Sequence, residues 1–455
     1  MAKSAAAAVL IGSLSLTGCA IYRPAPLPEG PDLANSVSAL RVPGDSIQGA
    51  SDGEMAFDAD DGLDMDEVVA LAVLNNPELK AKRAQRGIRR AELFNAGLLP
   101  DPQLSAGIDH PTGGPGDLMN AYNLGINADI RPLITRGAAQ DAARARVRQV
   151  DLQVLWQEWQ VAEQARKLFV ETRAQSQLHQ VYQSAVDLHR EHYQADRRSM
   201  DRGDVSLSVV AGDLASLVNA NSRLRSLERA RNQTRHRLHQ LLGLKPDVTL
   251  TFAGTTEVSP VTRDDLQTAL SDLDQRRPDL LALKAGYSSQ EATVRKEILK
   301  QFPTLNVGIT RAQDTSGVRT IGLGVSVSLP LFNRNQGGIA VARANRHRLR
   351  QAYQSRLDNA ASQADQACHE ADLLQRQLKQ VKSRLPQLQR VVEHAQTALK
   401  AGDLDAGTYV SLRGQLLDRR VEAIQLERSL EQSRIALQTL LAMPLATKTP
   451  GAPTR

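Results

Sequence analysis

The sequence contains the same series of landmarks twice, in the same order and about 200 residues apart. NNPELKAKRAQ near residue 75 corresponds to RRPDLLALKAG near residue 276, and PQLSAGI at Pro102 corresponds to PTLNVGI at Pro303. DRGDVSL and HQLLGL in the first half correspond to KAGDLDA and QTLLAM in the second half. Matches at nearly one offset indicate that the chain is two copies of one structural unit.

Each copy contains the same expected elements. A short helix leads to a helix that starts with Pro, over 77–97 and 278–300, because Pro suits the first helical turn. Two strands follow, then a helix of roughly 65 residues, or about 100 Å at 1.5 Å per residue, a Gly-Asp turn and a shorter return helix. The predicted boundaries are repeat 1 at 63–245, a linker at 246–261, repeat 2 at 262–443 and a C-terminal tail at 444–455.

Within each repeat the positions of the elements follow from these landmarks. For repeat 1 we expect strands at about 102–110 and 121–131, the long helix at about 136–201 and the return helix at 205–243. For repeat 2 we expect strands at about 303–311 and 319–330, the long helix at about 335–400 and the return helix at 404–442.

The expected strands alternate apolar residues with small polar ones. In the last strand, the apolar series from Ile321 to Leu329 alternates with Thr, Gly and Ser. A sheet on a soluble core gives the same pattern, but nothing else in the sequence is suited to cover these strands, which favours a membrane barrel. Four strands cannot close, and an open edge is excluded in lipid, so several chains must share one barrel. Three chains would supply twelve strands.

The long helix of repeat 2 carries apolar residues at alternating spacings of four and three, which is a heptad seam. This pattern predicts helices paired side by side. The seam residues are Leu374, Leu378, Val381, Leu385, Leu388, Val392, Ala395 and Leu399.

The start of the sequence has the form of a secretory signal. Lys3 precedes a short apolar run, which ends in Leu-Thr-Gly-Cys, a series that resembles a bacterial lipobox. The resemblance implies cleavage after residues 1–18 and a covalent lipid on Cys19, and the Pro- and Asp-rich residues 19–62 then form a tether. An ordinary signal with an incidental Cys is the alternative. Ala20 follows the Cys instead of the Asp that retains lipoproteins in the inner membrane, so the expected destination is the outer membrane.

Composition and motifs exclude several classes of function. The net charge of +6 comes from Arg scattered along helices, which argues against nucleic-acid binding. Phosphate loops, nucleophile elbows and zinc-protease motifs are missing from the sequence, so no enzyme is predicted. Cys368 and His369 are adjacent and point in different directions on a helix, which favours a packed Cys. His189 with His192, and His236 with His239, lack a third ligand, so no metal site and no cofactor beyond the lipid are predicted.

Together, the lipobox, the duplication, the junction LPLFNRNQGGIAVARA and the Gly-Asp hairpin ends resemble the TolC family of outer-membrane efflux channels over about residues 64–443. The FNRNQG motif is more similar to the cobalt-zinc-cadmium branch. The resemblance implies a mainly α homotrimer with a twelve-strand outer-membrane barrel and a twelve-helix periplasmic barrel. It also implies a place in the outer membrane of a Gram-negative bacterium. The implied partners are outer-membrane lipid, a periplasmic adaptor and a proton-driven inner-membrane pump.

Candidate site residues lie where strands meet helices and where helices turn. Pro330 should end the last strand and Asn335 should cap the following helix, with Pro132 to Gly137 making the same turn in repeat 1. At the hairpin ends, Gly positions suit positive φ and the Asp after each Gly can cap the next helix. Junction residues are Pro132, Gly137, Pro330, Asn335 and Gly337; expected docking residues are Gly203, Asp204, Val205, Gly402, Asp403 and Leu404; expected gate residues are Glu393, Asp403 and Asp405.

The function implied by the resemblance is the outer-membrane channel of a tripartite efflux system that exports metal cations or drugs. A type I protein-secretion channel of the same fold is one alternative. A coiled-coil envelope lipoprotein without a channel is a second, and an envelope hydrolase is a third.

Overall fold

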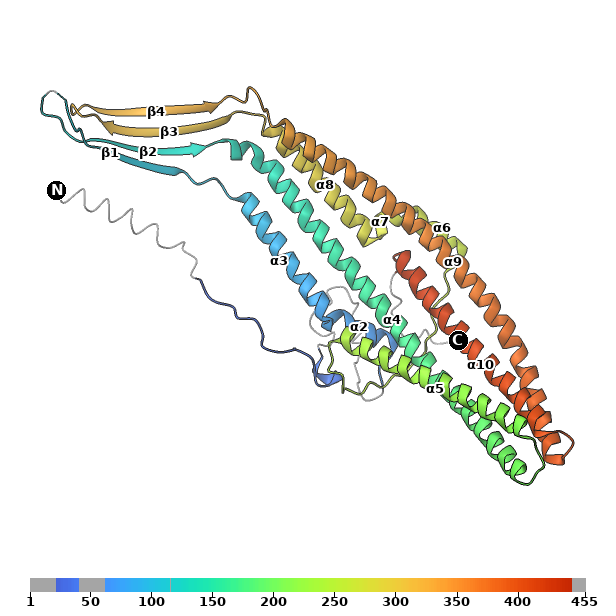
Figure 1. Cartoon of the computed structure of the whole chain (residues 1–455). Coiled ribbons are helices and arrows are strands. Elements are labelled where there is room, and N and C mark those ends of the chain that lie inside the picture. Colours follow the sequence, from blue (N-terminus) through green and yellow to red (C-terminus); the bar gives the residue numbers. More distant parts are fainter. Residues whose placement is uncertain (1–21, 41–61, 115, 444–455) are drawn as a thin grey trace, which may run out of the picture.

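The computed structural model describes residues 22–40, 62–114 and 116–443. These residues form an elongated molecule with a sheet at one end and two helical hairpins at the other (Figure 1). The predicted signal segment, Cys19, most of the tether and the tail at 444–455 lie outside the described residues. None of the helices in the described part of the chain combines the length and the hydrophobicity needed to cross a membrane.

The two repeats have the same order of elements. After the short 3-10 turn η1 (Val37–Ala39), repeat 1 consists of α2 (Met65–Asn75), α3 (Pro77–Gly97), β1 (Gln103–Asp109), β2 (Ala121–Asp129), α4 (Arg131–Asp201) and α5 (Leu207–Leu242). Repeat 2 consists of α6 (Arg263–Ser271), α7 (Leu273–Arg276), α8 (Pro278–Leu299), β3 (Thr304–Gln313), β4 (Arg319–Ser328), α9 (Gln336–Ala401) and α10 (Ala406–Leu440).

Two helices run most of the length of the molecule. α4 has 71 residues and α9 has 66 residues, or roughly 100 Å each at 1.5 Å per residue. α3 and α8 lie beside the halves of these helices nearest the sheet, whereas α5 and α10 lie beside the halves nearest the hairpin ends (Figure 1). α4 also packs against α8 and α10, so the two repeats share one framework.

The start of α3 shows why the Pro-first helices form where the sequence predicts them. Pro77 occupies the first turn, where its missing N–H is not needed. The Asn76 side chain accepts a hydrogen bond from the Leu79 N–H at 2.9 Å and so caps the helix. α8 begins at Pro278 in the same way, although the side chain of Arg277 before it makes no cap.

The largest apolar cluster lies midway along the molecule, where α2 and the end of α5 pack against α4. Leu71, Phe169 and Leu242 are fully buried there, and Ile435 of α10 joins them from the other repeat. Closer to the hairpin ends, the predicted heptad seam is confirmed, because Leu374 and Leu378 of α9 pack with apolar residues of α10. Cys368 is buried in a third cluster with Ala269 and Leu437, as a packed Cys should be.

Several predicted boundaries at the junctions and turns differ from the structure. α4 begins at Arg131, not at residue 136, so Pro132 and Gly137 lie inside the helix and make no turn. The reason is local: the Asp129 carboxylate accepts a hydrogen bond from the Arg131 N–H at 2.9 Å, and Pro132 sits in the first turn. The return helices begin at Leu207 and Ala406, two residues later than the predicted 205 and 404.

Candidate functional site

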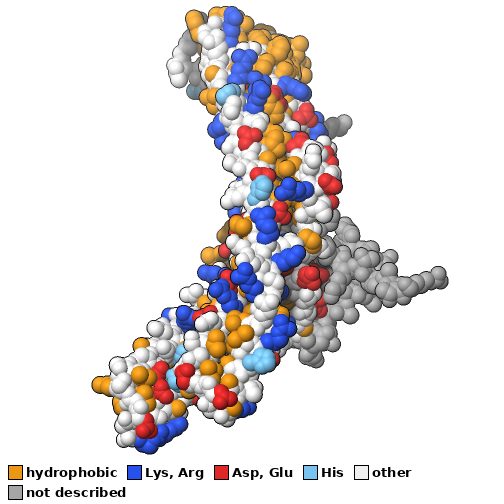
Figure 2. Space-filling view, turned by 90° about the vertical axis from the view of Figure 1, so that its right-hand side faces the viewer, with side chains coloured by type: hydrophobic (Ala, Val, Ile, Leu, Met, Phe, Trp, Pro, Cys, Tyr) orange, Lys and Arg blue, Asp and Glu red, His pale blue; other side chains and the backbone are white. Residues whose placement is uncertain are grey.

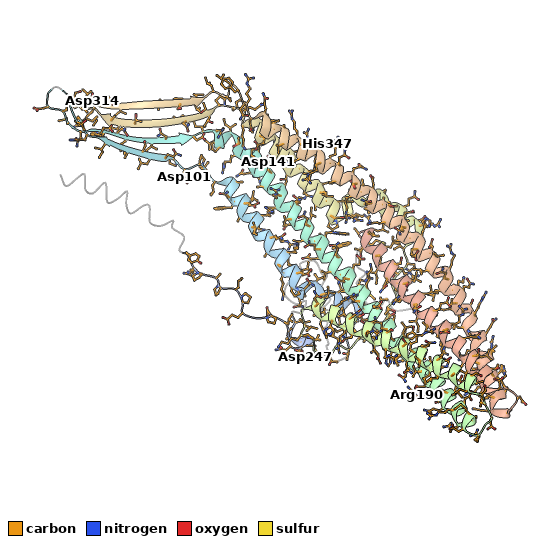
Figure 3. All side chains as sticks on the ribbon, in the orientation of Figure 1. Asp101, Asp141, Arg190, Asp247, Asp314 and His347 are labelled. Atoms are coloured by element: carbon orange, nitrogen blue, oxygen red, sulfur yellow. The ribbon has the colours of Figure 1, made fainter. Side chains whose placement is uncertain are left out.

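The sheet is antiparallel, with the strands in the order β1-β2-β3-β4. Its register pairs apolar residues with apolar residues, for example Val307 with Val325 and Leu104 with Ile126. Residues opposite each other in an antiparallel pair share a face, so one face of the sheet is apolar. Arg311, Gln313 and Arg319 are polar exceptions on this face, near the loop that carries Asp314 at the far end of the sheet (Figure 3). The face comprises Leu104, Ala106, Ile108, Tyr122, Leu124, Ile126, Ala128, Leu305, Val307, Ile309, Ile321, Leu323, Val325 and Val327.

This apolar face is uncovered in the single chain. Leu323 is 75% exposed and Ile321 is 79% exposed, which is the reverse of what a sheet on a soluble core shows. Figure 2 shows hydrophobic side chains gathered over the sheet end, with charged side chains spread along the helical part. A continuous exposed apolar surface of this kind is typical of a membrane or partner interface.

The opposite face carries small polar groups, with a carboxylate at each end, Asp109 and Asp129. Asn306 pairs with Ser326 and Thr310 pairs with Gly322, so hydroxyls, amides and bare backbone alternate across it. Gly308 leaves room for the Asn127 side chain, which a Cβ at that position would overlap. The face comprises Gln103, Ser105, Gly107, Asp109, Ala121, Asn123, Gly125, Asn127, Asp129, Thr304, Asn306, Gly308, Thr310, Ala312, Thr320, Gly322, Gly324, Ser326 and Ser328.

The junction between β4 and α9 differs from its prediction. β4 ends at Ser328, and Pro330 follows in an irregular segment that leads to Gly337 in the first turn of α9. Asn335 precedes α9 with φ of 52°, but its side chain caps nothing. Its amide nitrogen instead donates to the carbonyl and the carboxylate of Glu297 at the end of α8. Asn335 therefore joins two helices, and the cap prediction was wrong because the left-handed backbone turns the side chain toward α8.

At the hairpin ends, Gly203 and Gly402 have φ of 83° and 85°, as predicted for residues that end a helix. The Asp residues that follow them are not caps, which corrects the prediction. Asp204 forms an ion pair with Arg202 at 3.1 Å, and Ser206 precedes α5. α10 is capped by Asp405, not by Asp403, because Asp405 stands three residues before the Thr408 N–H that it accepts at 2.8 Å.

The expected docking surface is partly exposed. Val205 and Leu404 are half-buried in their turns, whereas Leu207, in the first turn of α5, is 72% exposed. Of the expected gate residues, Glu393 and Asp403 are exposed and Asp405 serves as a cap. Hydrogen bonds from the Thr408 hydroxyl and backbone hold the pKa of Asp405 below its usual range. The docking and gating roles of these residues stay predictions.

Equivalent residues of the two repeats perform the same task with different chemistry. Asn76 donates its amide to the carbonyl of Leu241 at the end of α5, at 3.1 Å. The matching residue, Arg277, donates to the carbonyl of Leu440 at the end of α10, at 3.2 Å. Each contact fastens a Pro-first helix to the end of a return helix. Sequence reasoning used this position as a landmark of the repeat but missed its role.

Arg277 is fully buried, and its charge is compensated. Asp279 accepts two hydrogen bonds from it, at 2.9 and 2.8 Å, and a third from Arg356 at 2.6 Å. The guanidinium of Arg277 lies 4.9 Å from the ring centre of Trp156 on α4. Burial alone would raise the pKa of Asp279, but the hydrogen bonds and charges of the two arginines outweigh it, so the pKa lies below its ordinary value.

Comparison with known proteins agrees with this geometry. The family model for "Outer membrane efflux protein" matches residues 269–443, which is most of repeat 2. This part of the chain is therefore similar to outer membrane efflux proteins. A curated relative, the pyoverdine export outer membrane protein OpmQ of Pseudomonas aeruginosa, is 26% identical over 181 residues. The aligned segment spans 38% of this chain and 38% of OpmQ.

Solved structures match this chain over most of its length. The CmeC outer membrane channel of Campylobacter jejuni has a TM-score of 0.70 at 16% identity, covering 93% of this chain and 95% of that one. The outer membrane protein VceC of Vibrio cholerae has a TM-score of 0.68 at 14% identity, covering 83% and 96%. At these identities the likeness concerns the fold, including the part of repeat 1 that the family model does not reach.

Proposed function

We propose that this chain is the outer-membrane channel of a tripartite efflux system that exports small solutes from a Gram-negative cell. The observation that carries the proposal is the sheet: one face is mostly apolar and exposed, and the other carries small polar groups. Strands that face lipid on one side and water on the other need this division. The curated relative is a pyoverdine export protein, which favours a small solute over a secreted protein as cargo.

The edges of the sheet support a shared barrel. β1 and β4 are the two edge strands of the described sheet, and each pairs on one side. In lipid, unpaired backbone groups are costly, so β4 of one chain would pair with β1 of the next. Three chains would close a barrel of twelve strands. Below it, α3, α4, α8 and α9, together with α5 and α10, would form a helical tube. TolC-family members are trimeric channels that work with adaptors and inner-membrane pumps, in agreement with this arrangement.

The polar face of the sheet, which would line the barrel, favours a channel with little selectivity of its own. Between Asp109 and Asp129, which lie at the two ends of this face, its side chains are mostly Asn, Ser, Thr and Gly, which offer hydrogen bonds but no charge to single out one ion. Choice of cargo would then rest with the inner-membrane pump, and a periplasmic adaptor would join pump and channel at the hairpin ends. The lipid on Cys19 would hold each chain to the outer membrane.

The test combines conductance and export. Purified protein in planar bilayers should show stepwise ion conductance, and deletion of the gene should raise sensitivity to at least one compound in a panel of metal salts, drugs and siderophores. Restoring the gene should restore tolerance. Protein that inserts without conductance, combined with a deletion strain of unchanged sensitivity, would overturn the proposal and favour a lipoprotein without a channel. Loss of a secreted protein with unchanged sensitivity would favour the secretion channel.

A further inference from the structure

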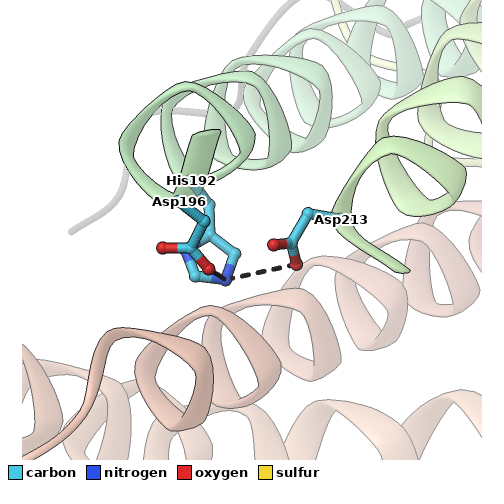
Figure 4. Close-up of side chains that lie close together, drawn as sticks. All are labelled: His192, Asp196 and Asp213. Carbon is cyan, nitrogen blue, oxygen red and sulfur yellow. Dashed lines mark ion pairs between the residues drawn. The ribbon is translucent and has the colours of Figure 1, made fainter. Parts of the chain in front are cut away.

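A cluster of ligand-type side chains joins α4 to α5 near the hairpin ends (Figure 4). His192 and Asp196 are one turn apart on α4, a spacing that places both side chains on the same face of the helix. Asp213 comes from α5, which runs back along α4 after the turn. His189, which the sequence pairs with His192, is not part of this cluster.

The distances in the cluster fit ligands around one ion. His192 Nε2 lies 3.6 Å from Asp196 Oδ2 and 3.4 Å from Asp213 Oδ1. These contacts are longer than the roughly 2.7–2.9 Å of a charge-assisted hydrogen bond. Ligands at about 2.0–2.2 Å from a tetrahedral zinc ion are separated by roughly 3.4 Å, the edge of the tetrahedron. One ligand atom from each of the three residues lies within 4.8 Å of the other two.

The cluster is largely buried. The side chains of His192, Asp196 and Asp213 are 10%, 18% and 17% exposed. Asp213 Oδ2 is buried and finds no hydrogen-bond partner in the described part of the chain. The buried Oδ2 of Asp213 is suited to bind a metal ion, because burying a polar atom without a hydrogen-bond partner costs free energy.

We propose that His192, Asp196 and Asp213 bind a divalent transition-metal ion, such as Zn²⁺, which clamps α4 to α5 near the hairpin end. An imidazole with two carboxylates suits Zn²⁺, Co²⁺ or Ni²⁺ more than Mg²⁺ or Ca²⁺, which prefer oxygen ligands alone. A water molecule would complete the coordination. The site is a brace within one helical hairpin, so it does not depend on the cargo of the proposed channel.

Binding can be measured on the full chain in detergent after treatment with a chelator. Zn²⁺ titrated calorimetrically should bind at one ion per chain, and Co²⁺ should give visible absorption bands typical of low-coordinate nitrogen and oxygen ligands. The variant Asp213→Asn should bind Zn²⁺ at least about 10–100-fold more weakly, the loss seen even for changes outside the ligand set. His192→Ala should abolish the Co²⁺ bands.

A matched control lies on α9. His369 and Asp365 have the same spacing and are 3.7 Å apart, but both are more than 60% exposed, and no third ligand joins them in the described residues. His369→Ala should leave Zn²⁺ affinity and the Co²⁺ bands unchanged.

Circular dichroism of the metal-free variants separates loss of binding from loss of fold. We expect the metal-free variants to give the same helical spectra as the wild type. On adding Zn²⁺, the unfolding temperature of the wild type alone should rise. Wild-type affinity in both Asp213→Asn and Asp196→Asn, or no saturable binding in the wild type, would overturn the site and leave a buried ion triad in its place.

Discussion

The side-chain amide of Asn335 donates to the backbone carbonyl of Glu297 at 2.8 Å and to its carboxylate at 2.9 Å. These bonds connect the end of α8 to the start of α9, on either side of the β3–β4 hairpin. Asn335 also adopts φ of 52°, where Asn is tolerated better than most residues. The contact fixes the angle at which the second strand pair leaves the helices.

Replacing Asn335 tests this connection. Asn335→Gly adopts the left-handed backbone without strain and loses only the side-chain hydrogen bonds. Asn335→Ala loses these hydrogen bonds and also strains the left-handed backbone. We expect the free energy of unfolding to fall by about 1–3 kcal/mol for Gly and by roughly 1 kcal/mol more for Ala. Guanidinium unfolding of detergent-solubilised protein measures both. Glu297→Gln keeps the backbone carbonyl and one side-chain oxygen as acceptors, so it should cost less than either Asn335 variant; equal losses in all three variants would contradict this account.

The buried pair of Arg277 and Asp279 predicts a pH dependence. Because the folded pKa of Asp279 lies below its unfolded value, its contribution to stability is complete above about pH 4–5. It is lost as pH falls through the lower, folded pKa. Asp279→Asn should therefore lower the unfolding free energy by roughly 3–5 kcal/mol at pH 7, with the gap to the wild type narrowing toward pH 3.

The control for this pair is an ion pair of similar length on the surface. Arg89 and Glu92 are 2.6 Å apart on α3, and their side chains are 35% and 47% exposed. Glu92→Gln should leave stability nearly unchanged at pH 7, because exposed pairs contribute little. If the difference in unfolding free energy between Asp279→Asn and the wild type widens on acidification, the predicted direction of the pH dependence is wrong.

The strand register predicts opposite outcomes for neighbouring substitutions. Val325 lies on the apolar face and Ser326 on the polar face of β4. Val325→Arg should cost about 2–4 kcal/mol near the membrane midplane and reduce the amount of protein in the outer membrane. Ser326→Arg should assemble normally and change single-channel conductance. Membrane fractionation and bilayer recording distinguish the two, and equal damage would mean that the faces are reversed.

The exposed apolar residue at the first hairpin predicts adaptor contact. Leu207→Asp should leave membrane assembly intact while reducing both export and cross-linking to the adaptor, because it places a charge in an apolar contact. Ser208→Asp, next to it and also exposed, is the matched control. Export and cross-linking that persist in Leu207→Asp would move the docking surface to the flanks of the helices.

The lipobox predicts acylation of Cys19. Cells supplied with a radioactive fatty acid should label the wild-type chain, and Cys19→Ser should abolish the label, since its hydroxyl does not replace the thiol in this modification. Label retained by Cys19→Ser would place the lipid elsewhere or exclude it.

Patterns that repeat along the chain were readable from the sequence. The duplication, the long helices and the alternating faces of the strands depend on periodicity, which one sequence displays directly. The caps at the turns were not readable: Asp405 caps α10 instead of Asp403, a choice that depends on where the turn places the first free N–H groups. Asp213 reaches His192 only because α5 returns along α4 in one register, and a sequence does not display the register of two packed helices.

The unpaired edges of the described sheet have a genetic consequence. In the proposed ring each chain offers β1 to one neighbour and β4 to the other, so a single chain with a damaged edge breaks the closure. If normal and damaged chains are made equally and mix at random, about one ring in eight contains normal chains alone. A damaged allele would therefore be dominant over the normal one, and export would fall far below half in a cell where half of the chains are intact.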